Sequence, residues 1–388
     1  MTGTVDLSMT EEQVALVAAV RDFAASALAP YANERDAQKH FPLEALRAAG
    51  EMGLGAVYVR EDVGGSGLTR RDAVALFEEL GHGDTTLAAY ISIHNMVAWM
   101  IDQYGGAEQR ARWLPRLATM EDLGAYCLTE PGVGSDAAAL TTSARRDGEE
   151  YVLTGTKQFI SGAGSAAVHV VMARTGGPGP DGISAIVVPA GAAGLSFGPL
   201  ERKMGWNAQP TRQVVLDEVR VPVSNRLGEA GAGFTIAMKA LNSGRANIAA
   251  VSVGGARWAL ERAARYVQER EAFAAPLATH QSVVFRLADM ETELHAARLL
   301  VRRAAERIDA GAPDEAVACA MAKRFATDTA FDVANAALQL HGGYGYLHEY
   351  GVERVVRDLR VHQILEGTNE IMRLIIGRDV LRRARRRV

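Results

Sequence analysis

A single carboxylate near the end of the chain is the first candidate for chemistry. The segment ILEGTNEIMR, residues 364–373, sets Glu366 between an apolar pair and a glycine. Most isolated glutamates are solvated, because burying a charged carboxylate without a partner is costly. On its own, Glu366 is best interpreted as a surface acid, so other parts of the sequence must decide whether it does chemistry.

A second polar segment is YCLTEPGVGSD, residues 126–136. Thr129 and Ser135 supply hydroxyl groups, and Gly132 and Gly134 leave the backbone N–H groups uncovered. Such a loop can come close to a flat ring or to an anionic group. Spacing alone favours a simple Pro-Gly turn, so this interpretation also needs support.

A third segment contains an arginine that could bind a phosphate. Arg270 lies in EREAF, residues 269–273, and His280 and Gln281 follow a few residues later. The planar guanidinium can bind phosphate with two parallel hydrogen bonds. Taken alone, a solvated arginine on a helix is the better interpretation.

Motifs for several other chemistries are absent from the sequence. It contains no phosphate-binding loop with its lysine and no G-x-G-x-x-G at a strand–helix turn. Cys127 and Cys319 show no C-x-x-C spacing, and the nine histidines show no metal-ligand spacing. We therefore expect no metal site and no disulfide framework. The lack of disulfides also predicts that the protein works in a reducing compartment.

The composition is that of an ordinary globular protein, with 48% hydrophobic and 23% charged residues among 388. The net charge of −4 gives no electrostatic reason to bind nucleic acid or an anionic membrane. No uninterrupted apolar stretch approaches the length of a membrane span, and the N-terminus has no secretory or transit-peptide pattern. These features predict a cytoplasmic protein, and the arginine cluster at 382–387 is interpreted as a solvated helix end.

The elements that must position the polar segments begin with helices. Thr10 and Gln13 have the spacing of a capping box, which predicts a helix start. Apolar residues then recur at steps of three and four up to Pro30, where we expect the helix to stop. The members of this apolar face are Leu16, Val20, Phe23 and Ala27.

The pattern changes near residue 121. Short β-rich runs, such as YVLTGTKQFISG and ISAIVVPA, are separated by glycine and proline until about Leu227. Long amphipathic helices follow, and the apolar stripe of one of them is Leu287, Leu294, Ala297, Val301, Ala304 and Ile308. We predict a mainly α protein with a helical domain at 1–120, a β domain at 121–228 and a four-helix bundle at 229–388.

Four segments together resemble the acyl-CoA dehydrogenase family: AYCLTEPGVGSDAA, TGTKQFISGAG, QLHGGYGY and VRDLRVHQILEGTNEIMR. They occur in the family's order over nearly the whole chain. The resemblance implies an N-terminal helical domain, a middle β-barrel-like domain and a C-terminal four-helix bundle, which is the order predicted above. It also implies a homotetramer built from dimers, FAD at the dimer interface, and an electron-transfer flavoprotein as electron acceptor.

In this resemblance Glu366 matches the catalytic base, which removes the α-proton of an acyl-CoA. Burial beside an acyl chain would raise the pKa of Glu366 above its reference of about 4.3 and make it a stronger base. The thioester oxygen needs hydrogen-bond donors as it gains enolate character, and the family supplies the backbone N–H of the base and a ribityl hydroxyl. The β-hydrogen leaves as hydride to the flavin.

The resemblance also implies binding residues. Those at the flavin are Tyr126, Leu128, Thr129, Gly134, Ser135, Phe159, Ile160, Ser161, Thr368 and Glu370. Those at the pyrophosphate and adenosine of FAD are Arg270, Phe273 and Gln281, and those reaching across the dimer are Gln339, Gly342 and Gly343. Those at the substrate are Ser135, Asn242, Arg245, Leu365 and Gly367.

Further segments, including KMGWNAQPTR and LNSGRANIA, are closest to members that act on isobutyryl-CoA. Asn242 stands where many straight-chain members have aspartate, and Leu365 where several have a bulkier aromatic residue. We therefore expect a short branched acyl-CoA as substrate. The alternatives are 2-methylbutyryl-CoA, butyryl-CoA, an oxidase that passes electrons to oxygen, and an inactive flavin-binding paralogue.

Overall fold

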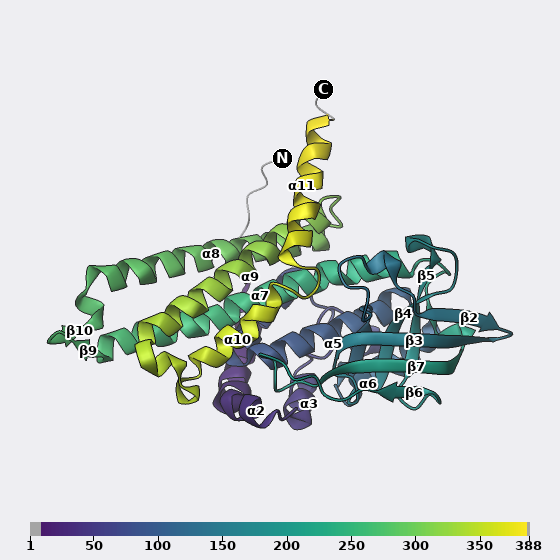
Figure 1. Cartoon of the computed structure of the whole chain (residues 1–388), viewed down its shortest axis with the longest axis horizontal. Coiled ribbons are helices and arrows are strands. Elements are labelled where there is room, and N and C mark those ends of the chain that lie inside the picture. Colours follow the sequence, from purple (N-terminus) through teal and green to yellow (C-terminus); the bar gives the residue numbers. More distant parts are fainter. Residues whose placement is uncertain (1–8, 386–388) are drawn as a thin grey trace.

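The computed structural model describes residues 9–385, which form helices, then a β-sheet, then helices again (Figure 1). This order confirms the predicted fold class. One contiguous cluster of buried apolar residues includes Phe77, Val214 and Val253, one from each of the three parts. The three parts therefore share a core rather than folding around separate ones.

The N-terminal part consists of helices. They are α1 (Glu11–Phe23), α2 (Ala32–Gln38), α3 (Leu43–Glu51), α4 (Arg70–Gly83), α5 (Thr85–Tyr104) and α6 (Ala107–Ala118). The predicted capping box is present, because Thr10 Oγ1 accepts a hydrogen bond from the Gln13 backbone N–H and Gln13 Oε1 accepts one from the Thr10 N–H. The predicted stop at Pro30 is wrong. The chain passes through a π turn and a 3₁₀ turn and continues as α2, because proline near the start of a helical turn removes only a donor that has no partner there.

One helical stretch, Glu11–Gln38, has the length and apolar composition of a membrane span. Its apolar residues Val20, Ala24 and Leu28 belong to the buried core. Arg21 interrupts it and donates two hydrogen bonds to the Glu79 carboxylate on α4. These contacts assign the stretch to the helical layer of the N-terminal part.

The middle part is a sheet of eight strands among the described residues. The strands are β1 (Gly124–Cys127), β2 (Ser143–Asp147), β3 (Glu150–Ser161), β4 (Val168–Arg174), β5 (Ile183–Pro189), β6 (Leu195–Phe197), β7 (Thr211–Pro222) and β8 (Arg226–Leu227). The order is β6-β7-β3-β2-β4-β5-β8, and β1 pairs in parallel with β4. The β3–β7 register shifts between Lys157 and Ile160, and Phe159 inside this bulge has a φ of 59°. A bulge of this kind redirects a side chain that regular pairing would hold in the pleat.

The C-terminal part contains the long helices α7 (Gly233–Glu269), α8 (Gln281–Asp309) and α9 (Glu315–His341), followed by α10 (Val352–His362) and α11 (Asn369–Arg385). The small hairpin β9 (Glu271–Ala272) and β10 (Ala275–Pro276) joins α7 to α8 at one end of the molecule (Figure 1). Of the predicted apolar stripe on α8, the central members are buried: Leu294, Ala297, Val301 and Ala304. Leu287 and Ile308 at its ends are half-buried against the same core.

Candidate active site

The loop between α10 and α11 carries Glu366 in an unusual backbone conformation. Glu366 has a φ of 55° and Gly367 a φ of 90°, so two successive residues are left-handed. Glycine adopts this conformation freely, whereas a glutamate needs surrounding contacts to hold it there. The loop therefore turns sharply and directs the Glu366 side chain inwards toward α7.

Two buried cations hold the carbonyl groups of this loop. Arg245 on α7 donates from Nε to the Glu366 carbonyl oxygen at 3.0 Å. Lys323 on α9 donates from Nζ to the Gly367 carbonyl oxygen at 2.9 Å and to Asn369 Oδ1 at 2.9 Å. The loop is thus anchored from two helices by its backbone, and the Glu366 side chain takes no part in the anchoring.

The Glu366 carboxylate lies against the backbone of α7 at Gly244. A Cβ atom added at Gly244 would lie 2.7 Å from Oε2 and 2.8 Å from Oε1. Oε2 is enclosed, and no group within residues 9–385 forms a hydrogen bond with it. A carboxylate in such a site keeps both its oxygens available, and Gly244 provides the space for it.

Burial raises the pKa of Glu366 from its ordinary value of 4.5 to about 7, and the positive charges of Arg245 and Lys323 act in the opposite direction. The residue as a whole is half-buried, but its carboxylate oxygen Oε2 is enclosed by the protein. The interpretation of Glu366 as a solvated surface acid is therefore wrong. The carboxylate titrates near neutral pH, as a general base for a weakly acidic proton requires.

Two donors lie near the Glu366 carboxylate without partners of their own. The Glu366 backbone N–H donates no hydrogen bond within the described part of the chain. The Tyr126 hydroxyl at the end of β1 is enclosed and equally unpaired among residues 9–385. Burial raises the pKa of Tyr126, and the charge of Glu366 raises it further, so the phenol stays protonated as a donor. Unpaired donors beside a base are suited to a ligand oxygen that gains negative charge.

Buried polar groups hold the loop after β1 in place. This loop contains four of the predicted flavin contacts: Leu128, Thr129, Gly134 and Ser135. Lys157 on β3 has a fully buried side chain and donates to the Leu128 carbonyl at 3.0 Å and to Glu130 Oε1 at 2.9 Å. Glu130 also accepts hydrogen bonds from the backbone N–H groups of Thr141 and Thr142. These bonds lower the pKa of Glu130 to about 2 although burial acts to raise it, so the carboxylate remains ionised.

The outer side of the same loop is open. In the part of the chain that the structure describes, no atom lies within 4 Å of a Cβ built at Gly132 or Gly134. Phe159 projects beside it from the β3 bulge with 64% of its surface exposed. Ile160 is buried beneath, and Ser161 Oγ accepts a hydrogen bond from Gln209 Nε2 at 3.2 Å. Open backbone, an exposed aromatic ring and the unpaired Tyr126 hydroxyl fit the face and polar edge of a flavin.

The remaining predicted FAD residues lie elsewhere in the chain. Arg270 is at the end of α7, 26 residues beyond Gly244, which is about 39 Å along a helix. Phe273, in the β9–β10 hairpin, is 93% exposed, and Gln281 is the first residue of α8. The chain therefore does not bring this group to Glu366.

The predicted residues at the end of α9 lie beside Arg270. Tyr344 follows the glycine pair and holds its ring 5.6 Å from the Arg270 guanidinium. Gln339 is in the last turn of α9, and Gly342 and Gly343 follow it, with no atom of the described residues within 4 Å of a Cβ built at either glycine. Arg270, the hairpin and this turn thus form one exposed group at the far end of the bundle.

The other predicted residues surround the Glu366 loop. Thr368 caps α11, because its Oγ1 accepts from the Ile371 N–H at 3.4 Å, and Glu370 in the first turn is exposed. Asn242 is buried, accepts from Arg245 and donates to Glu315 Oε1 at 3.4 Å. Leu365 is half-buried against the core.

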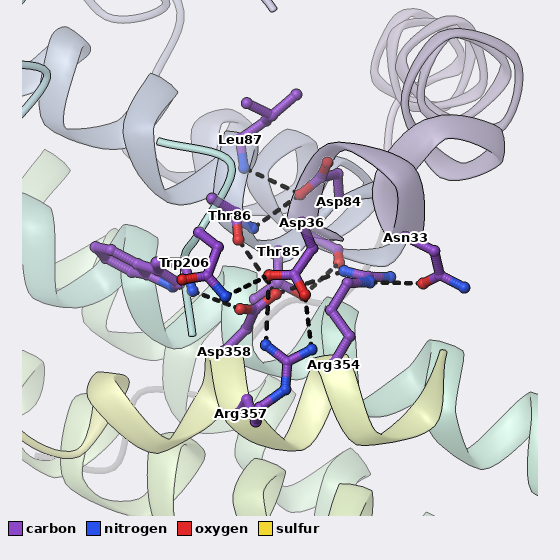
Figure 2. Close-up of polar contacts among 12 residues, drawn as sticks. Asn33, Asp36, Asp84, Thr85, Thr86, Leu87, Trp206, Arg354, Arg357 and Asp358 are labelled. Carbon is purple, nitrogen blue, oxygen red and sulfur yellow. Dashed lines mark hydrogen bonds and ion pairs between the residues drawn. The ribbon is translucent and has the colours of Figure 1, made fainter. Parts of the chain in front are cut away.

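The helix before the loop is held by a polar cluster in which all three parts of the molecule meet (Figure 2). Arg357 on α10 pairs with Asp36 of α2 at 2.7 Å and with Glu353 at 2.5 Å, and it donates to the Met204 carbonyl. Its neighbour Asp358 is buried and accepts from the Trp206 N–H at 2.6 Å. Burial raises the pKa of Asp358 to about 6.

The last residue of α10 extends this cluster toward the loop. His362 Nε2 accepts a hydrogen bond from Trp206 Nε1 at 3.1 Å, and Nδ1 lies 2.7 Å from Ser252 Oγ on α7. Burial lowers the pKa of His362 to about 3, so the ring is neutral. Because Glu366 follows four residues later, the three-part junction sets where the loop begins.

Sequence patterns did not single out Gly244, Lys323, Lys157 or Glu130. For Lys323 a signal exists, since it lies four residues after Cys319 and three before Ala326, both fully buried on α9. A lysine on the apolar stripe of a helix is a departure from pattern that favours a functional interpretation. Gly244 offers no comparable signal, because its role depends on a residue 122 positions away.

Comparison with known proteins gives a consistent result. Family models for the acyl-CoA dehydrogenase N-terminal, middle and C-terminal domains match residues 10–121, 125–219 and 231–381. The chain is 52% identical over 375 residues to the mitochondrial isobutyryl-CoA dehydrogenase of Bos taurus, covering 97% of this chain and 90% of that protein. It is 51% identical to the corresponding enzyme of Dictyostelium discoideum, covering 96% and 90%.

Solved structures agree over the full length. Butyryl-CoA dehydrogenase from Megasphaera elsdenii has a TM-score of 0.94 and 37% identity, covering 97% of this chain and 100% of that one. A chain from a structure of the electron transferring flavoprotein of Acidaminococcus fermentans has a TM-score of 0.95 and 38% identity, with the same coverage. A glutaryl-CoA dehydrogenase from Mycobacterium smegmatis in complex with FADH2 has a TM-score of 0.90 and 31% identity, covering 96% and 95%.

The chain therefore belongs to the acyl-CoA dehydrogenase family. It is an FAD-dependent oxidoreductase that acts on the CH–CH bond of an acyl-CoA, and the open loop at Gly134 beside Phe159 fits that cofactor.

Proposed function

We propose that this enzyme oxidises isobutyryl-CoA to methacrylyl-CoA, with Glu366 as the catalytic base. The observation that carries the reaction is the enclosed Glu366 carboxylate, whose Oε2 has no hydrogen-bond partner within residues 9–385. Identities of 52% and 51% to two isobutyryl-CoA dehydrogenases support the branched substrate. Oxidation of this substrate places the enzyme in valine breakdown, and we propose the cytoplasm as its location.

Glu366 removes the α-proton and holds it on the carboxylate. The unpaired Glu366 backbone N–H donates to the thioester oxygen as it becomes enolate-like, which lowers the barrier to proton removal. Bound FAD supplies the acceptor for the β-hydride. Arg245 keeps the Glu366 backbone in place through its 3.0 Å hydrogen bond, so the base stays aimed at one position.

Two further residues bear on the acyl group. Leu365 immediately precedes the base and packs half-buried against the core, so a bulkier ring at this position would take up more space beside Glu366. Asn242 holds Arg245 through a 3.1 Å hydrogen bond without adding a negative charge to the loop's surroundings. We propose that both residues favour a short branched acyl chain over a longer straight one.

We propose that a second copy of the chain completes the FAD site. Arg270 lies at the end of α7, about 39 Å along the helix from Gly244, and Phe273 and Gln281 follow it in the exposed hairpin and at the start of α8. A homotetramer built from such dimers accounts for this arrangement. The likeness to the chain from the Acidaminococcus fermentans structure supports an electron-transferring flavoprotein as electron acceptor.

Steady-state rates on isobutyryl-CoA, 2-methylbutyryl-CoA and butyryl-CoA, with an artificial electron acceptor, test the substrate. We expect the highest kcat/KM on isobutyryl-CoA and a shift toward butyryl-CoA in Leu365→Tyr. A clear preference of the unmodified enzyme for butyryl-CoA would overturn the branched assignment. Hydrogen peroxide formation without an added acceptor would instead identify an oxidase.

A further inference from the structure

A lysine buried beneath the Glu366 loop has no part in the steps described above. The Lys323 side chain has no exposed surface and reaches from α9 to two oxygens, the Gly367 carbonyl and Asn369 Oδ1, each at 2.9 Å. Both acceptors are neutral. Among residues 9–385, no carboxylate oxygen lies within 4.0 Å of its Nζ as an ion-pair partner.

Keeping such a cation buried is unfavourable unless a nearby negative charge stabilises it. Burial lowers the pKa of Lys323 to about 8, and the charge of Glu366 is the leading influence in the opposite direction. A neutral side chain could make the same hydrogen bonds at lower desolvation cost. The buried charge lies at the carbonyl of Gly367, the residue next to Glu366. This position requires an explanation.

We propose that Lys323 is a positioning residue for the reaction: it holds the Glu366 loop by the Gly367 carbonyl, and its buried positive charge at the residue next to Glu366 favours the ionised form of the base. This inference rests on the proposed role of Glu366 as the base. Lys323 acts on the base without hydrogen-bonding to it, so Glu366 is stabilised as an anion but keeps its oxygens free for the substrate proton.

Other groups that face Glu366 limit how much Lys323 can do. Arg245 on α7 is the stronger of the two positive influences, and the phenols of Tyr126 on β1 and Tyr58 between α3 and α4 sense the same carboxylate. The groups that face Lys323 are Arg245, Asp328, Glu370 and His362. Removing Lys323 therefore leaves one cation beside Glu366, and we expect a weakened but not abolished preference for the ionised form.

A neighbouring residue offers a control that shares the scaffold role and carries no charge. Thr327 lies one turn further along α9, is fully buried, and bonds the same Asn369 by accepting from its Nδ2 at 3.0 Å. Its hydroxyl also donates to the Lys323 carbonyl at 2.8 Å. Thr327→Val removes this anchor with almost no change in volume, so it reports what loosening the loop does by itself.

The test measures the pKa of Glu366 in the FAD-loaded enzyme without substrate. Infrared spectra recorded as a function of pH follow the protonated carboxyl band, which is assigned by its loss in Glu366→Gln. We expect Lys323→Met and Lys323→Gln to raise this pKa by about one unit, the size typical of losing a nearby opposite charge. Lys323→Gln retains a donor for the Gly367 carbonyl, so it separates the charge from the hydrogen bond.

The pH dependence of turnover gives a second readout. The rising limb of kcat against pH is expected to move upward by the same amount in both Lys323 variants and to stay in place in Thr327→Val. An unchanged Glu366 pKa in both Lys323 variants would overturn the proposal, as would an equal shift in Thr327→Val. If no acyl-CoA supports turnover although the infrared shift is present, the proposed function fails while the coupling of Lys323 to Glu366 stands.

Discussion

Single residues at this site are held in states that they would not adopt in water. The Glu366 carboxylate has a pKa near 7 because it is enclosed, and its left-handed backbone is held by hydrogen bonds to two carbonyls from Arg245 and Lys323. A strained, partly desolvated base is typical of an active site, where stability is given up for function.

Glu366→Gln is expected to stabilise the protein at high pH. Because the folded-state pKa of about 7 lies above the ordinary 4.5, the folded form binds more protons between these values, and its stability falls as pH rises through this window. The shift corresponds to up to about 3 kcal/mol at pH 8. Urea unfolding of the unmodified protein and of Glu366→Gln at pH 5 and pH 8 measures this difference in the free energy of unfolding. If the difference between the two proteins is the same at both pH values, the Glu366 carboxylate is not desolvated.

Ionisation of Glu366, which lowers the stability of the folded protein as pH rises, is expected to raise its activity. The base must be ionised to accept a proton, so kcat/KM of the unmodified enzyme is expected to rise with pH along a limb centred near pH 7. Steady-state rates between pH 5.5 and 9 on one acyl-CoA test this. A limb centred near 4.5 would contradict the enclosure of Glu366.

Gly244→Ala is expected to lower kcat by about 100-fold, because the new methyl group would sit within 3 Å of both Glu366 oxygens and displace the base. Folding should be little affected, since alanine favours the helix more than glycine does. The matched control is Gly377→Ala on α11, where no atom of the described residues lies within 4 Å of the added carbon. Turnover and thermal unfolding of both variants separate displacement of the base from a general effect of the substitution.

At the scale of elements, each of the two loops that form the site is held in place by hydrogen bonds from buried charged side chains. The loop after β1 is tied to β3 through Lys157 and Glu130, and the Glu366 loop is tied to α7 and α9. Loops carry the chemistry, but strands and helices fix their positions. This division explains how the glycine-rich backbone near Gly134 stays open and still ordered.

Lys157→Met is expected to weaken FAD binding and to destabilise the fold by about 3 kcal/mol, because it leaves Glu130 buried without its cation. The double variant with Glu130→Gln should recover part of the stability, since the unpaired charge is then removed. Urea unfolding and the flavin content of the purified proteins measure the two effects. Full flavin content in Lys157→Met would contradict the role assigned to this pair.

At the scale of the whole molecule, the position of Glu366 depends on all three parts. Arg357 on α10 is bonded to Asp36 of the N-terminal helices (Figure 2). It also donates to the Met204 carbonyl of the middle part. Asp358 and His362 contact Trp206 from the same helix. The junction couples the arrangement of the three parts to the start of the Glu366 loop.

Arg357→Leu is expected to destabilise the protein by about 3 kcal/mol, because two largely buried carboxylates, Asp36 and Glu353, lose the arginine that pairs with both of them. The matched control is Arg220→Leu, an arginine with 50% exposed side chain that also bonds two carboxylates, Asp147 and Glu150. That surface change should cost at most about 1 kcal/mol. Calorimetric unfolding of the two variants compares their losses of stability. Similar losses in Arg357→Leu and Arg220→Leu would show that the junction has no special role.

Local patterns in the sequence determined the order of the elements and where several of them begin and end. The capping box at Thr10, the apolar stripe of α8 and the glycine pair after α9 are local features, since helix starts, faces and ends depend on residues within a few positions. The stop predicted at Pro30 failed because proline blocks one hydrogen bond but does not dictate how the chain resumes.

Only the tertiary structure decided what Glu366 is. Its enclosure depends on Gly244, Arg245 and Lys323, which lie 43 to 122 positions away and meet it only when α7 and α9 pack together. The separation of Arg270 from this site is likewise set by the length of α7. Desolvation and long-range charge are properties of packed surroundings, so a pattern of neighbouring residues can name the acid but cannot give its pKa.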